Sequence, residues 1–408
     1  MADYRTVQKG EHTLRRRISP VRASYHPPAM LSEQWRADLD GHHIIALHWS
    51  PDGRTVAVAS ADGPTVLFDA HGGLRQHSFP RHGLGTLALA WHPDSTVLAS
   101  AGQDGTIRLW DAASGVEQVV LRGGGAWVER IAWSSYATQP APVLRGRNAK
   151  ALAIPPRSTQ PALLASAAGR VLRLWDLEGQ LLREYRDHPS TIADIAWMPS
   201  SGRIRPTDHA ARASAGESSA ILAVATYGGL TLRRPDREEP LGRYAWQGST
   251  LVIAWSPDGR FIATGDQDST VHFWITRTGT DLQMWGYPTK VRELAWNSTS
   301  RYLATGGGAT VTVWDCAGKG PANTRPIELK AHEGQLATLA FQKRGPLLAS
   351  GCSDGLVVIW QVGTSRHPLA KVQFKSGISQ LAWSPDDHVL AVGTEGGEVA
   401  VFTIPNIA

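Results

Sequence analysis

The sequence predicts an all-β protein made of one repeated unit, and three observations lead to this fold class. A run of alternating apolar residues that ends in an aromatic residue recurs through almost the whole chain. Within each unit, apolar and polar residues alternate over short segments, which is the pattern of half-buried strands. Gly, Pro and Asp turn signals separate these segments at the spacing of antiparallel strands. No helical period competes with this pattern.

The composition limits the class of protein. The 408 residues are 42% hydrophobic and carry a net charge of +5, which excludes a wholly disordered chain. No apolar run reaches the roughly 18 residues of a membrane-spanning helix. Two cysteines, Cys316 and Cys352, are too few for a disulfide framework or a zinc cage, and residues 1–20 lack the apolar stretch of a secretory signal. We therefore expect a soluble cytoplasmic protein, or a nuclear one in a eukaryote, without membrane insertion.

The repeat is anchored by the aromatic residue that ends the first strand of each unit. Most spacings between these anchors are 41–45 residues, and the two longer ones, 64 and 58 residues, indicate insertions. The anchoring residues are Trp49, Trp91, Trp133, Trp197, Trp255, Trp296, Phe341 and Trp383.

A second aromatic position ends the third strand of most units. The clearest unit is LALAWHPDSTVLASAGQDGTIRLWD, residues 87–111. The two strand-end positions together use 12 of the 16 Trp residues, which indicates that most of the tryptophan packs in the core. The third-strand residues are Phe68, Trp110, Trp175, Trp274, Trp314, Trp360 and Phe402.

With these residues, the chain resembles the WD-repeat family of β-propellers over residues 32–404. The family's Trp-Asp pair stands at 110–111, 175–176 and 314–315. The resemblance implies a hydrogen-bonded network of His, Ser, Asp and Trp within a blade. The matching residues are His82, Ser100, Asp104 and Trp110 in the second unit and His332, Ser350, Asp354 and Trp360 in the seventh. The third unit has Gly124 where His is expected, and the fourth has Arg234 where Trp is expected.

The number of units and the chain termini predict how the ring closes. Eight sets of first to third strands imply eight four-stranded blades, and seven blades with one degenerate unit is the alternative. The eighth unit ends without an outer strand, whereas residues 32–42 read as an outer strand before the first unit. We therefore expect residues 32–40 to complete the last blade, because an open edge strand is a template for aggregation.

Outside the repeat, the basic residues gather in a tail and two insertions. Residues 31–408 form one propeller domain, and the tail, residues 1–30, carries a charge of +4 and is expected to be disordered. The insertions at 135–161 and 200–219 both follow the first strand of their unit, so the resemblance places them together on one face. Their charges of +4 and +1 would attract an acidic partner, and the alternative is that both insertions are solvated, disordered loops. The residues expected to contact it are Arg145, Arg147, Lys150, Arg157, Arg203 and Arg205.

On the opposite face, one tryptophan stands where the repeat requires none. Trp127 lies six residues before its anchoring aromatic, a position that the resemblance assigns to the rim of the propeller. Exposed Trp and Arg are frequent anchors of protein interfaces. We therefore expect a partner-binding site with Trp127, Glu129, Lys290 and Arg292, and the alternative is that Trp127 folds over the degenerate third blade.

No motif indicates chemistry. The sequence has no phosphate-binding glycine loop and no Gly-x-Ser-x-Gly motif. His42, His43 and His48 have no acid or Cys cluster to complete a metal shell. We therefore expect no enzymatic activity, no cofactor and no metal.

Two functions remain from this reading. The first is a non-enzymatic scaffold or adaptor, a monomeric propeller that binds one or more proteins within a larger assembly. The alternative is a propeller associated with nucleic acid or ribonucleoprotein through the basic tail and loops. The affinity for nucleic acid would fall steeply as the salt concentration rises, whereas the affinity of a protein contact anchored by Trp127 would be far less sensitive to salt.

Overall fold

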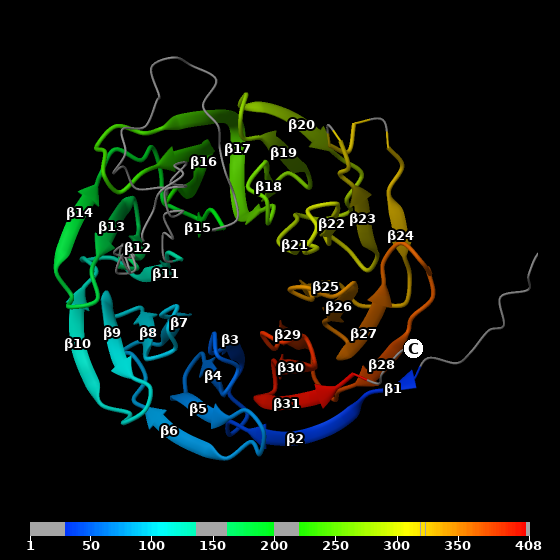
Figure 1. Ribbon diagram of the computed structural model, residues 1–408, viewed down its shortest axis with the longest axis horizontal. Coiled ribbons are helices and arrows are strands. Elements are labelled where there is room, and N and C mark those ends of the chain that lie inside the picture. The colour runs from blue at the N-terminus through cyan, green and yellow to red at the C-terminus, as the bar shows by residue number, and fades with distance from the viewer. Residues whose placement is uncertain (1–28, 136–160, 200–219, 319, 323, 405–408) are drawn as a thin grey trace, which may run out of the picture.

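The computed structural model describes residues 29–135, 161–199, 220–318, 320–322 and 324–404. In this part of the chain every regular element is a β-strand, and the strands form a closed ring around a central opening (Figure 1). No helix in these ranges is long and apolar enough to cross a membrane. The prediction of an all-β propeller is confirmed.

Each repeat unit places its first strand beside the central opening and its fourth strand on the outside (Figure 1). The first strands are β3 (Ile44–Trp49), β7 (Thr86–Trp91), β11 (Val128–Trp133), β15 (Asp194–Trp197), the second half of β17 (Gly242–Trp255), β21 (Leu294–Trp296), β25 (Leu336–Phe341) and β29 (Ile378–Trp383). The second strands are β4 (Thr55–Ser60), β8 (Val97–Gly102), β12 (Leu164–Ala168), the first half of β16 (Leu222–Arg233), β18 (Phe261–Asp266), β22 (Tyr302–Thr305), β26 (Leu347–Cys352) and β30 (Val389–Thr394).

The outer half of each unit follows the same order. The third strands are β5 (Thr65–Asp69), β9 (Thr106–Asp111), β13 (Val171–Trp175), the second half of β16, β19 (Val271–Ile275), β23 (Val311–Asp315), β27 (Leu356–Gln361) and β31 (Glu398–Thr403). The fourth strands are β6 (Arg75–Phe79), β10 (Glu117–Arg122), β14 (Leu181–Tyr185), the first half of β17, β20 (Thr280–Met284), β24 (Ile327–Leu329), β28 (Ala370–Gln373) and β2 (Ser32–Asp38).

The eight repeat units occupy seven hydrogen-bonded sheets. Units 4 and 5 share one sheet of six strands, because β17 runs from the outer edge of unit 4 to the first-strand position of unit 5 (Figure 1). Its residues 242–245 pair with β16, and residues 250–255 pair with β18. Counted as sheets, the propeller therefore has seven blades. The expectation of eight four-stranded blades is therefore wrong, and the alternative count of seven is confirmed, because residues 246–249 stay extended within β17 instead of leaving the sheet as a loop.

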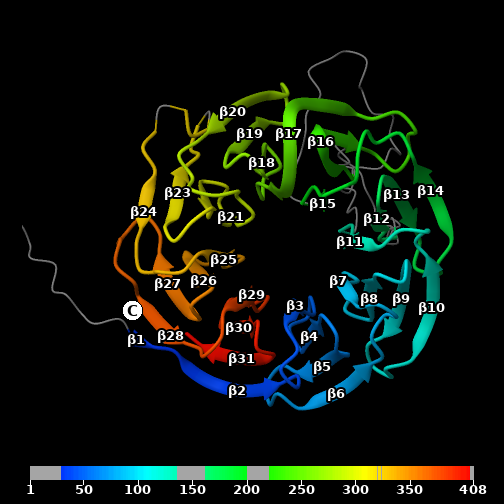
Figure 2. The same ribbon diagram turned by 180° about the vertical axis from the view of Figure 1, so that it is seen from behind.

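The ring is closed by the strand that the sequence predicts. β2 pairs antiparallel with β31, from Ser32 opposite Thr403 to Asp38 opposite Glu398. The short strand β1 (Ala29–Met30) pairs in parallel with β28 of unit 7. In Figures 1 and 2, β2 lies outside β31, and the first inner strand β3 lies beside the last inner strand β29. The N-terminal strand thus removes the free edge of β31.

The core lies between the units rather than inside them. Eight clusters of buried apolar side chains each join two consecutive units, including one between unit 8 and unit 1. The second strand is buried on both faces, as in β8 and β26, because both neighbouring units cover it. A unit alone would expose both faces, so each one depends on its neighbours for burial of apolar surface.

A ring of indole hydrogen bonds joins the inner strands. In six of the units, the anchoring Trp donates its Nε1–H to a backbone oxygen of the first strand of the preceding unit. The bond from Trp49 to Ala382 O, 2.9 Å, spans the point of closure. The other five join Trp91 to His48 O, Trp197 to Ala132 O, Trp255 to Ala196 O, Trp296 to Ala254 O and Trp383 to Ala340 O, at 2.9–3.2 Å.

Aromatic contacts repeat the same connection further from the centre. An aromatic residue of the fourth strand packs on the residue that ends the third strand of the next unit. Phe79 stacks on Trp110 with ring centroids 4.5 Å apart, and Tyr244 stacks on Trp274 at 5.4 Å. At closure, Trp35 of β2 packs on Phe68 at 5.6 Å and donates its indole N–H to Ala70 O. The N-terminal strand therefore fills the same place as an ordinary fourth strand.

The turns after the first strands link neighbouring units on one face. Ser95, Ser300 and Asp387 have positive φ angles of 58–70°, which is the left-handed region. The Ser95 hydroxyl accepts a hydrogen bond from the backbone N–H of Asp52, 3.0 Å away in unit 1. The Asp387 carboxylate accepts three backbone N–H groups from residues 343–345 of unit 7. These turns therefore join neighbouring units by hydrogen bonds, in addition to the apolar clusters between the units.

The indole ring allows a matched test. Trp133 Nε1 is buried without a hydrogen-bond partner among the described residues, whereas Trp197 Nε1 bonds to Ala132 O. We expect Trp197→Phe to lower the free energy of unfolding by about 1–2 kcal/mol more than Trp133→Phe, because it also removes the indole donor from the partly buried Ala132 carbonyl. Urea denaturation of both variants measures the difference. Equal losses would show that the indole bonds do not stabilise the ring.

Candidate interaction surface

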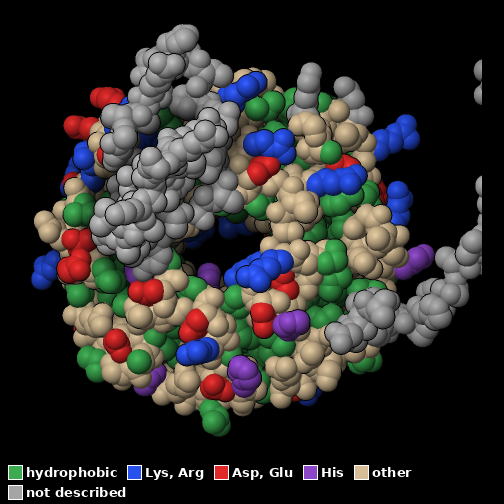
Figure 3. All heavy atoms as spheres, in the orientation of Figure 1, with side chains coloured by type: hydrophobic (Ala, Val, Ile, Leu, Met, Phe, Trp, Pro, Cys, Tyr) green, Lys and Arg blue, Asp and Glu red, His purple; other side chains and the backbone are tan. Residues whose placement is uncertain are grey.

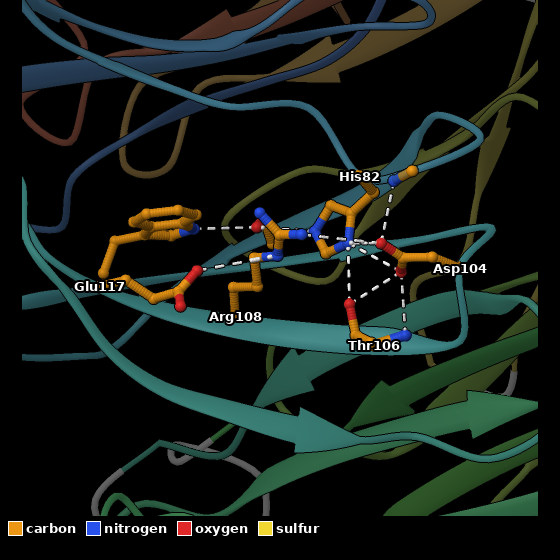
Figure 4. A network of polar contacts seen from close by, with 8 residues as sticks. His82, Asp104, Thr106, Arg108 and Glu117 are labelled. Atoms are coloured by element: carbon orange, nitrogen blue, oxygen red, sulfur yellow. Dashed lines mark hydrogen bonds and ion pairs between the residues drawn. The ribbon is translucent and has the colours of Figure 1, made fainter.

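A polar network within unit 2 holds the loop that precedes its first strand. His82 is buried and lies 3.0 Å from Asp104 through Nδ1 and 2.9 Å from Ser100 Oγ through Nε2 (Figure 4). Ser100 Oγ also accepts the indole N–H of Trp110 at 2.9 Å. Asp104 accepts the backbone N–H of Gly83, so the network connects the interior of the blade to this loop.

Unit 7 has the same His, Ser and Trp contacts as unit 2, and unit 6 has a related network in which one residue type differs. In unit 7, His332 contacts Ser350 Oγ at 2.7 Å, and Ser350 accepts the indole N–H of Trp360. In unit 6, a tyrosine takes the place of the histidine. The Tyr287 hydroxyl accepts the indole N–H of Trp314 and lies 2.9 Å from Thr305 Oγ. Burial raises the pKa of Tyr287 to about 12, so its hydroxyl stays protonated as a donor.

Buried arginines replace network residues in units 3 and 4. Arg173 fills the space beside Gly124, where His was expected, and pairs with Glu184 at 2.7 Å. Arg233 lies 4.3 Å above the ring of Tyr185 and pairs with Asp187. It occupies the place that Trp110 has in unit 2, which corrects the sequence expectation of Arg234 by one residue.

One histidine of unit 4 is buried without charge. Burial and the nearby Arg233 guanidinium lower the pKa of His188 to about 4. The imidazole is therefore neutral at pH 7, and Nδ1 lies 3.2 Å from Arg170 O. In return, the Arg170 guanidinium donates two hydrogen bonds to the backbone oxygen of His188. This exchange holds the loop between β14 and β15.

We call one face of the ring the upper rim. It is formed by the loops between fourth and first strands and by the turns between second and third strands. Two bonds tie these parts together, from Gly83 N to Asp104 and from Tyr227 N to Ser190 Oγ. Four large side chains stand exposed on it: Leu84 at 67%, Trp127 at 50%, Tyr227 at 58% and Trp285 at 73% of their surface.

The structure places the residues predicted for partner binding as follows. Trp127, Lys290 and Arg292 are exposed on or beside the upper rim, and Glu129 is half-buried at the start of β11. Half of the Trp127 surface is exposed. Outside the described residues lie residues 1–28 of the tail, 136–160 of the first insertion and 200–219, the whole second insertion. They include all six basic residues of the prediction, Arg145, Arg147, Lys150, Arg157, Arg203 and Arg205.

Three exposed rim residues were not predicted from the sequence, namely Leu84, Tyr227 and Trp285. A signal for Trp285 was present, because it is one of four Trp residues outside the two strand-end positions. Of these four, Trp35 seals the closure and Trp246 packs on His272 with ring centroids 3.8 Å apart. The two that remain, Trp127 and Trp285, are the exposed pair.

The face of the ring shown in Figure 3 does not carry one dominant charge among the residues drawn in colour. Basic and acidic side chains are interspersed on the face that Figure 3 shows, without an extended patch of one sign among the residues drawn in colour. Near the opening, Arg130 of β11 pairs with Asp194 of β15 at 3.2 Å. Asp194 also accepts the backbone N–H of Ile253, so these charges link three inner strands.

Comparison with known proteins identifies the repeat. The family model described as "WD domain, G-beta repeat" matches residues 34–63, 73–111, 245–274, 280–315 and 324–361. The matches include five of the eight anchoring aromatics and omit those of units 3, 4 and 8. In units 3 and 4, arginines replace network residues.

The chain is similar to several WD-repeat proteins over part of its length. It is 31% identical to "Cell division cycle 20.1, cofactor of APC complex" of Arabidopsis thaliana, over 37% of this chain and 34% of that protein. It is 29% identical to "WD repeat-containing protein slp1" of Schizosaccharomyces pombe, over 36% and 30% respectively, and 26% identical to "Protein HIR1" of Mycosarcoma maydis, over 49% and 21%. The chain thus matches between 21% and 34% of the length of these relatives.

A solved structure agrees with the fold. The computationally designed protein Ika8 aligns with a TM-score of 0.69 at 20% identity, covering 91% of this chain and 100% of the designed one. This likeness supports the ring architecture alone.

Unit 5 provides a test of how burial controls charge. Burial raises the pKa of Asp266 to about 6, although Thr250 and Thr264 donate hydrogen bonds to its carboxyl group. The ordinary value is about 3.9 in the unfolded chain, so the folded state holds the proton more tightly. The stability that this group contributes is therefore present at low pH and is lost as the pH rises through 6.

We expect Asp266→Asn, which cannot ionise, to raise the free energy of unfolding at pH 7.5 by up to about 3 kcal/mol. The gain shrinks as the pH falls to 5, and urea denaturation at both pH values measures it. Asp268→Asn, at an exposed position of the same turn, is the control and gives no such gain. A gain from Asp266→Asn that does not change with pH would contradict the charge argument.

Proposed function

Because the chain is a WD-repeat β-propeller, we propose that it is a non-enzymatic interaction platform that binds one or more proteins within a larger assembly. The observation that carries this proposal is the set of four large exposed side chains on the upper rim, Leu84, Trp127, Tyr227 and Trp285. Neither exposed tryptophan occupies a strand-end position of the repeat. Trp and Tyr are enriched among the residues that dominate binding energy at protein interfaces.

The rim suits binding because its loops are fixed before a partner arrives. The network of His82, Ser100 and Asp104 holds the loop that carries Leu84, and Ser190 holds the turn at Tyr227. A preformed surface loses little conformational entropy when a partner docks, so more of the contact energy becomes affinity. The fold therefore presents several anchors at fixed separations.

The same networks support a non-catalytic role for the described part of the chain. His82 and Ser100 belong to a Ser-His-Asp set, yet both are about 1–2% exposed. Ser100 Oγ is occupied by the indole N–H of Trp110 and by His82, so it is not free to attack a substrate. These residues hold the blade together.

The relatives favour the same class of function. One is named a cofactor of the APC complex, and another, from Dictyostelium discoideum, is named an anaphase-promoting complex subunit. Those names describe proteins that act within assemblies. We extend only this general role to the present chain, because the matches cover only 34% and 35% of the length of these two relatives.

The proposal predicts which substitutions abolish partner capture. We expect the double variant Trp127→Ala, Trp285→Ala to reduce the amount of co-purified partner at least about 10-fold, because anchors of this kind contribute 2 kcal/mol or more each. The measurement is quantitative affinity purification from the native host after nuclease treatment, with partners identified by mass spectrometry.

The matched control pair is Leu84→Ala and Leu74→Ala. The two leucines are similarly exposed, at 67% and 72%, but Leu74 lies in the turn between β5 and β6 on the other face. Leu84→Ala should weaken capture and Leu74→Ala should not. If the rim variants capture normally, and capture is lost with nuclease or when the six basic loop residues are changed to Ser, the chain binds nucleic acid and the platform proposal is wrong.

A further inference from the structure

Unit 7 brings together three side chains that can bind a metal ion. His332 Nδ1, Cys352 Sγ and a carboxylate oxygen of Asp354 lie within 4.8 Å of one another. The sulfur is 2.9 Å from Nδ1 and 2.5 Å from Asp354 Oδ1. We call these three residues the unit 7 cluster. The sequence did not predict it, because the residues are 20 positions apart and belong to the repeat network.

Unit 2 shows that the thiol is an addition to this network. Gly102 occupies the position of Cys352 there, and His82 contacts Asp104 directly at 3.0 Å. A Cβ atom on Gly102 would lie 2.3 Å from His82 Cβ and 2.6 Å from Gly85 O, so unit 2 has no room for a cysteine. In unit 7 the side chains are arranged around a thiol, which stands between the histidine and the aspartate.

The hydrogen bonds of Ser350 allow His332 to present a lone pair to the thiol. Ser350 Oγ accepts the indole N–H of Trp360 at 2.8 Å and has a backbone acceptor, Val358 O, at 3.4 Å for its own hydrogen. It can then accept Nε2–H from His332 at 2.7 Å, which leaves Nδ1 unprotonated. In this arrangement Nδ1, the sulfur and the carboxylate share a single proton, and a cation would satisfy all three.

A second arrangement of protons is possible in the same geometry. If Ser350 donates to Nε2, then Nδ1–H donates to the sulfur and the thiol donates to Asp354, which makes a hydrogen-bonded chain without a cation. The two arrangements differ in one measurable property, namely whether the cluster takes up a metal ion.

We propose that the unit 7 cluster is a binding site for a divalent cation of the zinc class, with His332 Nδ1, Cys352 Sγ and Asp354 as ligands. Imidazole nitrogen, thiolate and carboxylate form a ligand set that Zn²⁺ prefers. Asp354 is exposed, so water has access to a fourth position. The cluster is thus a three-ligand site with one open position.

The surroundings support the three ligands. Asp354 accepts backbone N–H groups from Gly334 and Leu356, and Ser350 orients the imidazole. Residues that hold the ligands in this way contribute to metal affinity. Zn–N and Zn–S bonds of about 2.0–2.3 Å require ligand atoms roughly 3.5 Å apart. The present distances from Cys352 Sγ, 2.9 Å to His332 Nδ1 and 2.5 Å to Asp354 Oδ1, are shorter, so metal uptake requires both neighbours of the sulfur to move away from it.

The test uses Co²⁺, because a thiolate bound to Co²⁺ gives a charge-transfer absorption in the near ultraviolet. The full chain is prepared without a histidine tag, reduced, freed of metal with a chelator and titrated with Co²⁺. We expect one thiolate-bound Co²⁺ per chain, displaced by Zn²⁺. Absence of the band in the wild-type protein would overturn the proposal, and failure of Zn²⁺ to displace Co²⁺ would overturn the zinc assignment.

The two cysteines provide matched variants. Cys352→Gly recreates the arrangement of unit 2, and we expect it to weaken Co²⁺ binding by more than about 100-fold, since even residues that only support a ligand change affinity about 10–100-fold. Cys316 is buried in unit 6, so Cys316→Ser should keep the band. A band that persists in Cys352→Gly, or disappears only in Cys316→Ser, would contradict the assignment. Partner capture plays no part in this experiment.

Discussion

The structure depends on the contact between each unit and the preceding one, which in six of the eight units includes a hydrogen bond from the anchoring indole to the preceding inner strand. A blade buries almost nothing by itself, because its apolar faces are covered only by its two neighbours. The indole bonds fix the inner strands relative to one another, and the stacked pairs such as Phe79 on Trp110 repeat the connection on the outside. Since every unit needs two neighbours, the ring is complete only when β2 joins unit 8 to unit 1.

Within this ring, the polar network of a blade tolerates different residues as long as the same space is filled. His82, Tyr287 and Arg173 occupy equivalent places in three units, and each keeps its loop tied to the blade. What these substitutions preserve is the position of the upper rim. Unit 7 differs further, because Cys352 adds a thiol to a network that in unit 2 contains only nitrogen and oxygen groups.

Much of the fold could be predicted from the sequence, because the same residue types recur at the strand ends and turns of most units. The closure by residues 32–40 followed from the missing fourth strand of unit 8. The shared sheet could not be predicted, since nothing in the residues from Trp246 to Ser249 shows that they stay extended. The exposure of Trp285 and the meeting of His332 with Cys352 depend on packing between strands distant in sequence. Of the four large exposed side chains on the upper rim, only Trp127 was predicted from the sequence, because it stands where the repeat requires no Trp.

The central claim is that the ring unfolds as one cooperative body. Hydrogen–deuterium exchange of a chain that starts at Asp40 tests this claim most directly. This chain lacks β1 and β2 and therefore the Trp35 contacts at the closure. The account predicts that the inner strands of all units lose protection together, because each unit relies on closed neighbours. Loss of protection confined to β28 and β31, with the other units as protected as in the full chain, would contradict it.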